Sequence, residues 1–256
     1  MLTVNTTPLV CLPIQLDFRL RLQGFVLDLH VQIDVQAAAL VGPPGSGKSM
    51  TLQVIAGLKK PDCGFIRIAD RVLFDSQRGI NVRVCDRRVA YVPQQDVGLF
   101  PHLDVRQNVI YGARQAHQRS LERGCGFDRV AQMLGILPIL GHRVSELTAG
   151  ERQRVALARA IVSNPDLLLF DEPLVGLDRL RTPLMPYLQR VRNETSVTLI
   201  YVTHNRAEAQ ALAELVIVLN GGNVERLGPP DILGTSPIRS KTGQSHCLDC
   251  RKPDLG

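Results

Sequence analysis

The chain lacks several features that would place it in other classes of protein. It contains no tryptophan, only 4% of its 256 residues are aromatic, and no segment resembles a nucleic-acid-binding module. No apolar run approaches the roughly 20 residues that a helix needs to cross a bilayer. The N-terminus also lacks the basic start and long apolar region of a secretion signal. We therefore expect a cytosolic protein without a membrane-spanning segment of its own.

The cysteines indicate neither a disulfide framework nor a clear metal site. All six are scattered, apart from Cys247 and Cys250, which fits reduced thiols in a cytosol. A single C-x-x-C without a second pair is weak evidence for zinc. The net charge of +6 suits a protein that lies against an anionic membrane face, although ordinary solubility explains it equally well.

The most specific motif is a phosphate-binding loop at residues 42–49, which read Gly-Pro-Pro-Gly-Ser-Gly-Lys-Ser and match G-x-x-x-x-G-K-[ST]. The apolar run at 37–41 predicts a buried parallel strand before the loop, and 51–58 predicts a helix that ends at glycine. In this context a glycine-rich turn with a chance lysine is the weaker interpretation. We expect the nucleotide, ATP, to be bound by Gly42, Pro43, Pro44, Gly45, Ser46, Gly47, Lys48, Ser49 and Met50.

Three of these side chains have distinct predicted roles. Lys48 is expected to reach the β and γ phosphates, and the Ser49 hydroxyl to bind Mg²⁺. Met50 stands where many such loops carry a second hydroxyl near the α-phosphate. Because a neutral hydrogen bond contributes only about 0.5–1.5 kcal/mol net, we expect Met50 to weaken nucleotide binding without abolishing it.

A pair of acids follows a second apolar run, at residues 166–170. Carboxylates at the end of a buried parallel strand lie at the sheet edge where ligands bind in doubly wound folds. Asp171 is expected to hold Mg²⁺, directly or through water, and Glu172 to activate the attacking water as a general base. Two adjacent acids in an ordinary turn are the alternative.

A third motif carries a family resemblance. Residues 147–160 read Leu-Thr-Ala-Gly-Glu-Arg-Gln-Arg-Val-Ala-Leu-Ala-Arg-Ala and resemble the signature of the ATP-binding cassette (ABC) ATPases. Residues 91–94 resemble the Q-loop of that family, 176–178 the D-loop and 201–204 the switch histidine. The resemblance covers roughly residues 12–233 and includes five motifs in the expected order.

The resemblance implies a fold and a division of the chain. It implies an α/β fold, a P-loop NTPase core of the ABC ATPase type with an antiparallel β subdomain and an inserted helical subdomain. The ATP-binding domain would span residues 1–233, with the helical subdomain at approximately 96–163. Residues 234–256 are rich in Gly, Pro, Ser and Lys and are expected to form a flexible tail.

The resemblance also implies roles around the acid pair. Gln94 would contact Mg²⁺ or the attacking water. His204 would contact the γ-phosphate and help to orient Glu172. Asp178 would lie at an interface between two copies of the chain.

The signature residues Thr148, Ala149 and Gly150 would bind the γ-phosphate that a second copy holds, through backbone amides, a hydroxyl and a helix N-terminus. Ala149 replaces a glycine of the family pattern. If the backbone there needs φ > 0 or close contact with phosphate, a Cβ costs about 1 kcal/mol or more, and turnover falls.

The adenine-stacking residue has two candidates. An aromatic side chain from the N-terminal strands usually stacks on adenine in this family. Phe25 and Phe18 are the candidates, and we take Phe25 as the prediction. Neither fits the family spacing well, and a lone phenylalanine is more often a core residue.

The predicted function is that of the ATPase of an importer. Segments 71–75, 86–92 and 184–190 resemble the molybdate importer ATPases most, and 99–105 resembles the stretch that lines the groove where a permease helix docks. These relatives usually carry a C-terminal oxyanion-binding domain, which we do not expect in this chain, so sulfate or another small solute stays open as the cargo.

The implied partners are a second copy of the chain, integral membrane permease subunits and a periplasmic or extracellular solute-binding protein, with no nucleic acid. The chain would lie peripherally on the cytoplasmic face of the cell membrane. Two alternatives come from other classes. One is a low-turnover regulatory cassette, suggested by Met50 and Ala149. The other is a soluble cassette for DNA repair or translation, which usually has coiled-coil insertions or two cassettes.

Overall fold

The computed structural model describes residues 11–94, 98–116, 126–172 and 185–234. The strands are β1 Ile14–Leu22, β2 Phe25–Ile33, β3 Ala37–Val41, β4 Cys63–Ile68, β5 Arg71–Asp75, β6 Ile80–Asn81, β7 Val89–Val92, β8 Leu167–Asp171, β9 Thr198–Val202, β10 Leu215–Asn220 and β11 Asn223–Gly228. The α-helices are α1 Lys48–Ala56, α2 Val105–Ala116, α3 Phe127–Met133, α4 Ala149–Val162, α5 Met185–Glu194 and α6 Arg206–Leu212. The short 3₁₀ turns are η1 Val84–Asp86, η3 Leu137–Ile139, η4 Val144–Glu146 and η5 Pro230–Gly234.

All the described strands belong to one sheet in the order β6-β5-β4-β1-β2-β11-β10-β3-β9-β8-β7. The last five, β10 to β7, pair in parallel. Every residue of β3, β8 and β9 is buried. Because both faces of these strands are covered, their sequences are continuous apolar runs and not alternating patterns, which confirms the strands predicted from the runs at 37–41 and 166–170.

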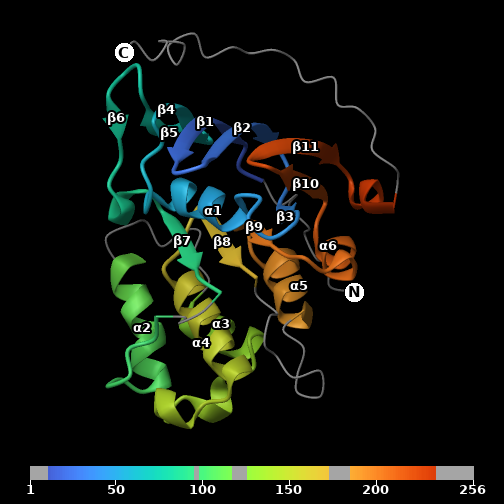
Figure 1. Cartoon of the computed structure of the whole chain (residues 1–256). Helices are drawn as coiled ribbons and strands as arrows, with labels where there is room; N and C mark the ends of the chain where they lie inside the picture. The colour runs from blue at the N-terminus through green and yellow to red at the C-terminus, as the bar shows by residue number, and fades with distance from the viewer. Residues whose placement is uncertain (1–10, 95–97, 117–125, 173–184, 235–256) are drawn as a thin grey trace, which may run out of the picture.

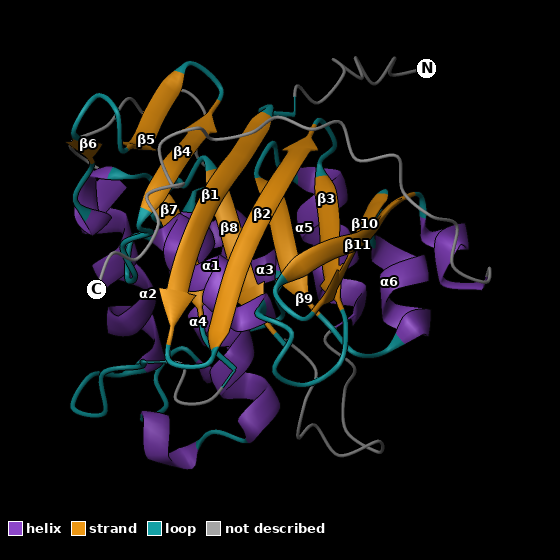
Figure 2. Ribbon diagram, turned by 45° about the horizontal axis from the view of Figure 1, so that its top comes forward, coloured by secondary structure: helices purple, strands orange, loops and turns teal. Residues whose placement is uncertain are grey.

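The other end of the sheet is antiparallel and covers α1. Strand β1 pairs with β2 and β4, and β4 continues through β5 to β6. In β1, alternate residues from Ile14 to Leu20 are buried, as expected for a sheet with one face on the core. Figures 1 and 2 show helix α1 between these strands and the parallel strands. Apolar side chains from both sets of strands form one core with α1.

Helices α2, α3 and α4 form a group at one end of the molecule (Figure 1). Their apolar faces share a second core with the opposite face of the parallel strands. Helices α2 and α4 approach closely at Gly112, where a Cβ atom would lie 2.2 Å from the carbonyl oxygen of Arg159. Gly112 therefore fixes how near the two helices can pack.

Most of the predicted elements are confirmed, and one expectation is wrong. Helix α1 ends at Gly57, whose φ of 85° forms a left-handed C-cap, as the glycine predicted. The expectation of reduced thiols fails at Cys63, which is disulfide-bonded. Cysteines that are scattered in the sequence can still meet once the chain is folded.

The proposed domain bounds stay predictions. Helices α2 to α4 lie within the 96–163 segment, whereas residues 235–256 of the predicted tail fall outside the described part. Within the described ranges, no helix is long and apolar enough to cross a membrane.

Candidate nucleotide-binding site

The phosphate loop leaves β3 at Gly42 and enters α1 at Lys48. Gly45 and Gly47 have φ values of 75° and 103°, a left-handed conformation that glycine adopts without a Cβ penalty. The Lys48 Nζ donates hydrogen bonds of 2.9 Å to the carbonyl oxygens of Gly42 and Pro43. Burial lowers the pKa of Lys48, although the carboxylates of Glu172 and Asp171 oppose this effect. The loop thus wraps around the ammonium group of Lys48.

Ser46 indicates that the loop is shaped for a ligand. Its side chain is only 3% exposed, yet its Oγ has no hydrogen-bond partner. A buried polar atom without a partner is costly and rare in native proteins. Together with the nearby ammonium group of Lys48, this hydroxyl fits a site that binds phosphate oxygens.

Asp171 ends strand β8 next to the loop. Its side chain is buried, with its Oδ1 accepting a 2.9 Å hydrogen bond from the Ser49 hydroxyl. Its Oδ2 accepts a 3.2 Å hydrogen bond from the Tyr91 hydroxyl. Burial raises the pKa of Asp171, with a smaller contribution from the charge of Glu172, while the hydrogen bonds from Ser49 and Tyr91 and the charge of Lys48 oppose the rise. A buried carboxylate of this kind is stabilised by a cation.

The Ser49 and Asp171 oxygens fit a magnesium ion. Mg²⁺ prefers oxygen ligands and usually takes one or two carboxylates together with substrate phosphates. The described residues hold no group of three or more His, Cys, Asp or Glu side chains that could bind a metal alone. The Ser49 and Asp171 oxygens suit an ion that shares its coordination with the phosphates of a nucleotide.

Glu172 lies close to polar side chains from the ends of the neighbouring strands. Its φ of 46° is left-handed, which is rare for a residue other than glycine and is found at functional sites. Its Oε2 accepts a 2.6 Å hydrogen bond from Gln94 Nε2 and lies 3.6 Å from His204 Nδ1. Because β7, β8 and β9 are adjacent and parallel, their carboxyl ends bring these three residues together.

The two candidates for adenine stacking, Phe25 and Phe18, lie in different surroundings. Phe25 borders the loop, because a Cβ atom on Gly47 would lie 3.2 Å from its Cζ and 2.9 Å from Leu27 Cδ1. Phe18 is 1% exposed and lies in the core, which leaves it no surface for adenine. Phe25 is partly buried against the same core, and its stacking on adenine stays a prediction. Met50 is partly buried and packs against the same core, which explains why a hydrophobic residue is accepted there.

The signature begins helix α4. Thr148 is the N-cap, and it exchanges hydrogen bonds with Glu151 in a capping box. Ala149 is the first helical residue and is not among the residues with positive φ. The backbone strain that a positive φ would cause is therefore absent. Gly150 follows in the same first turn.

The signature and the phosphate loop are separate within one chain. No hydrogen bond among the described residues joins 148–150 to 42–50. The structure therefore does not bring these predicted site residues together. The D-loop at 176–178 lies outside the described residues.

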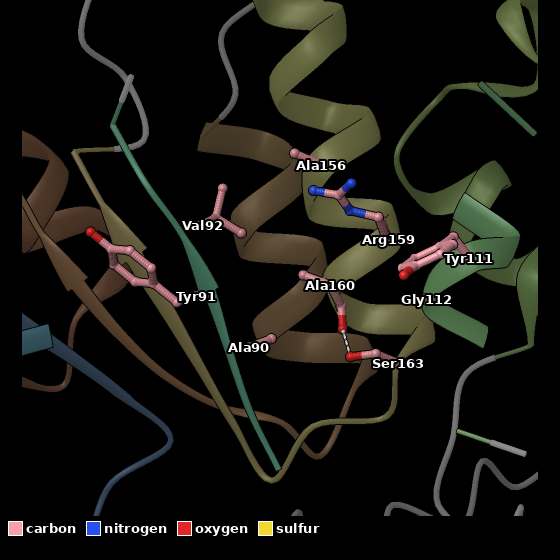
Figure 3. A pocket seen from close by; sticks show the side chains of 9 residues that line it. All are labelled: Ala90, Tyr91, Val92, Tyr111, Gly112, Ala156, Arg159, Ala160 and Ser163. Atoms are coloured by element: carbon pink, nitrogen blue, oxygen red, sulfur yellow. Dashed lines mark hydrogen bonds between the residues drawn. The ribbon is translucent and has the colours of Figure 1, made fainter. Parts of the chain in front are cut away.

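A pocket of about 200 Å³ lies between the sheet and the helices α2 and α4 (Figure 3). Arg159 stacks over the Phe100 ring at 5.4 Å, and Phe100 meets Tyr111 edge-on at 4.6 Å. The pocket is lined by Ala90, Tyr91, Val92, Tyr111, Gly112, Ala156, Arg159, Ala160 and Ser163. The sequence indicated only its rim, through the 99–105 segment. Arg159 and Tyr111 carried no signal of their own, since their contact depends on the crossing of two helices.

These features define a class of protein, a P-loop nucleotide-binding fold with acids at the adjacent strand ends. The profile of the ABC transporter family matches residues 28–175, and the chain belongs to that family. The ATP-binding cassette MJ0796, solved as a dimer bound to ADP and Pi, superposes with a TM-score of 0.65 at 26% identity over 85% of this chain and 98% of that one. The cbiO1 protein of Clostridium perfringens shares the fold, with a TM-score of 0.70 at 24% identity over 87% and 90% of the two chains.

Curated relatives give a narrower similarity. The Molybdenum import ATP-binding protein ModC of Mesorhizobium japonicum is 41% identical over 85% of this chain and 58% of its own length. The protein of the same name from Rhizobium johnstonii is 42% identical over 89% of this chain and 64% of its own length. The chain thus spans about 60% of the length of the curated relatives it matches.

Proposed function

We propose that this chain is the ATP-hydrolysing subunit of an ABC importer and that it couples ATP binding and hydrolysis to the uptake of an oxyanion, with molybdate as the first candidate. The observation that carries the proposal is the convergence of Lys48, Asp171 and Glu172 at one edge of the parallel sheet. Family membership supports the same conclusion.

Each side chain has a role in this reaction. When ATP binds, the Lys48 ammonium group leaves the loop carbonyls and hydrogen-bonds to the β and γ phosphates. Ser49, Asp171 and Gln94 would hold Mg²⁺, which neutralises charge on the phosphate oxygens when bound. Glu172 takes a proton from the attacking water as general base, while His204 orients that carboxylate and contacts the γ-phosphate. Phe25 stacks on adenine beside the loop.

The reaction needs a second copy of the chain. Thr148, Ala149 and Gly150 open a helix of 14 residues, and the free N–H groups of a helix N-terminus bind anions. Since the signature is not joined to the phosphate loop of its own chain, it can serve the γ-phosphate of the partner copy. The dimeric MJ0796 cassette supports this arrangement.

The permease would dock at the pocket between the sheet and helices α2 and α4. Its lining residues Tyr111 and Arg159 both contact the neighbouring Phe100 ring, so aromatic surface lies beside a guanidinium group, and Tyr111 is 43% exposed. A peripheral position on the cytoplasmic face of the membrane follows from this docking, with a solute-binding protein on the other side.

The cargo is proposed from the names of the relatives. Both relatives carry the name molybdenum import ATP-binding protein, and the proposal extends this to molybdate for the present chain. Uptake of labelled molybdate by cells that express the chain with its permease should exceed uptake of sulfate. Preference for sulfate or another solute would move the assignment to that cargo.

Glu172→Gln tests the hydrolytic role. The amide keeps the shape of the side chain and cannot accept the proton, so the variant should bind ATP, hydrolyse it at least about 100-fold more slowly and accumulate as a dimer in gel filtration. Glu225→Gln, on the exposed face of β11, is the control and should match the parent. Hydrolysis by Glu172→Gln at the parental rate would refute the assignment.

A low-turnover regulatory cassette is the second candidate, favoured by Met50 and Ala149. Steady-state ATPase activity in the presence of the permease separates the two. Turnover that the permease stimulates supports the importer, and turnover that stays near zero supports the regulatory cassette.

A further inference from the structure

Tyr91 holds the carboxylate of Asp171 from outside the residues assigned to the nucleotide site. Its hydroxyl donates a 3.2 Å hydrogen bond to Asp171 Oδ2, while Ser49 bonds to Oδ1. Among the described residues, Tyr91 and Ser49 are the only donors to this carboxylate.

The register of the sheet explains this contact. Tyr91 of β7 lies opposite Leu169 of β8. Since side chains alternate along a strand, Leu169 and Asp171 point to the same face, and Asp171 is the diagonal neighbour of Tyr91. Figure 3 shows the Tyr91 ring directed away from Arg159 and Ser163, on the other side of its strand. That side packs against the core around α1.

The two hydrogen bonds on Asp171 differ in what happens to them when Mg²⁺ binds. Ser49 and Asp171 are both proposed ligands, and their oxygens, 2.9 Å apart, match the edge of about 3 Å between adjacent ligands in an octahedral magnesium site. Tyr91 is not a ligand, so its bond fixes the carboxylate independently of the ion. Without it, the terminal torsion of an aspartate is broad.

We propose that Tyr91 is a positioning residue for the magnesium site, whose hydroxyl holds the Asp171 carboxylate at the angle that metal binding requires. The inference rests on the proposed role of Asp171. Second-shell hydrogen bonds to metal ligands typically change metal affinity by about 10–100-fold. Tyr91 is therefore expected to affect metal binding more than nucleotide binding.

The test is the Mg²⁺ dependence of binding of a fluorescent ATP analogue to the full chain. In Tyr91→Phe, the Mg²⁺ concentration for half-maximal binding should rise about tenfold, with binding in EDTA unchanged. Tyr187→Phe is the matched control, because it also removes a hydroxyl bonded to a charged group, Arg154, and should match the parent.

The outcomes separate this inference from the proposed function. Asp171→Asn should raise the Mg²⁺ requirement strongly, and if it does not, the assignment of Asp171 as a metal ligand fails. If Asp171→Asn does so and Tyr91→Phe behaves like the parent, the positioning role of Tyr91 is overturned while the metal site stands. Equal loss of binding with Mg²⁺ and with EDTA in Tyr91→Phe would also overturn it, since that pattern indicates a structural role.

Discussion

At the scale of the residue, the buried carboxylate of Asp171 lowers the stability of the folded protein when it is ionised. Burial raises its pKa in the folded protein above the value of 3.8 that it has when exposed. The folded state therefore binds the proton more tightly than the unfolded state does, and this contribution to stability is lost as the pH rises through the raised pKa. At neutral pH the ionised carboxylate costs stability in the absence of a bound cation.

Asp171→Asn should therefore stabilise the nucleotide-free protein. In calorimetry with EDTA at pH 7.5, we expect its Tm to rise by about 2–4 °C, the shift that 1 kcal/mol gives in a domain of this size. The difference should shrink as the pH falls and vanish below the unfolded pKa. Asp70→Asn, at an exposed position, should show no such trend. A lower Tm for Asp171→Asn at pH 7.5 would contradict the argument.

Gly47 gives a second prediction at this scale. Gly47→Ala places a Cβ atom 2.9 Å from Leu27 and 3.2 Å from Phe25, on a backbone with φ of 103°. Gly79→Ala is a matched control, with a φ of 67° and nothing within 4 Å. Both should lose about 1 kcal/mol of stability from backbone strain, and Gly47→Ala more because of its close contacts, as measured by urea denaturation. Only Gly47→Ala should weaken ATP binding in titration calorimetry, and equal ATP affinity in the two variants would argue against the loop as the phosphate site.

At the scale of the element, helix α1 depends on a buried arginine at its carboxyl end. Arg87 is 1% exposed, and its guanidinium donates to the carbonyl oxygens of Val54 and Ile55 at 3.1 and 2.9 Å. It also donates to the Val82 carbonyl and the Asn81 side chain. These bonds satisfy carbonyls that a helix end leaves open, and the positive charge opposes the negative end of the helix dipole.

Arg87→Met should destabilise the protein by about 3 kcal/mol, because it leaves several buried carbonyls without a donor. The Tm should fall by about 6–12 °C in a domain of this size, as measured by circular dichroism. Arg83→Met, which removes an exposed arginine from the same segment, should leave the Tm unchanged because surface ion pairs contribute little. A fall of similar size in both variants would rule out the cap as the cause.

The sequence predicted these elements unevenly, for a physical reason. The strands β3 and β8 and the phosphate loop were predictable because their signals are local: a continuous apolar run, a glycine spacing, a pair of acids. Arg87 and Tyr91 were quoted within motifs, yet their partners lie 32 and 80 residues away. No local pattern distinguishes a buried, bonded side chain of this kind from an exposed one.

At the scale of the whole molecule, local sequence patterns could not predict the order of the strands in the sheet. Neighbours in the parallel part, such as β3 and β9, are separated by more than half of the described chain. This order places Gln94, Glu172 and His204 together at one edge, while the signature at the start of α4 remains apart from the phosphate loop. In the proposed function the reaction centre is therefore held in two parts, which a second copy of the chain would complete.

Ala149→Gly tests whether the signature of a second copy completes the nucleotide site. Ala149 starts α4 without a positive φ, so its Cβ does not strain the isolated chain and can hinder only the approach of the partner's γ-phosphate. We expect turnover to rise by about threefold, equivalent to somewhat under 1 kcal/mol in the transition state, with little change in Tm. Ala211→Gly, at an exposed site in α6, controls for the cost of glycine in a helix and should not raise turnover.

The dependence of rate on protein concentration completes this test. If two copies share each site, specific activity should rise with concentration at the low end, and the gain in Ala149→Gly should be present once dimers form. Specific activity that is independent of concentration in a strictly monomeric sample would mean that one chain carries a complete site. In that case the signature would have no phosphate to bind, and the advantage of glycine at position 149 should disappear with it.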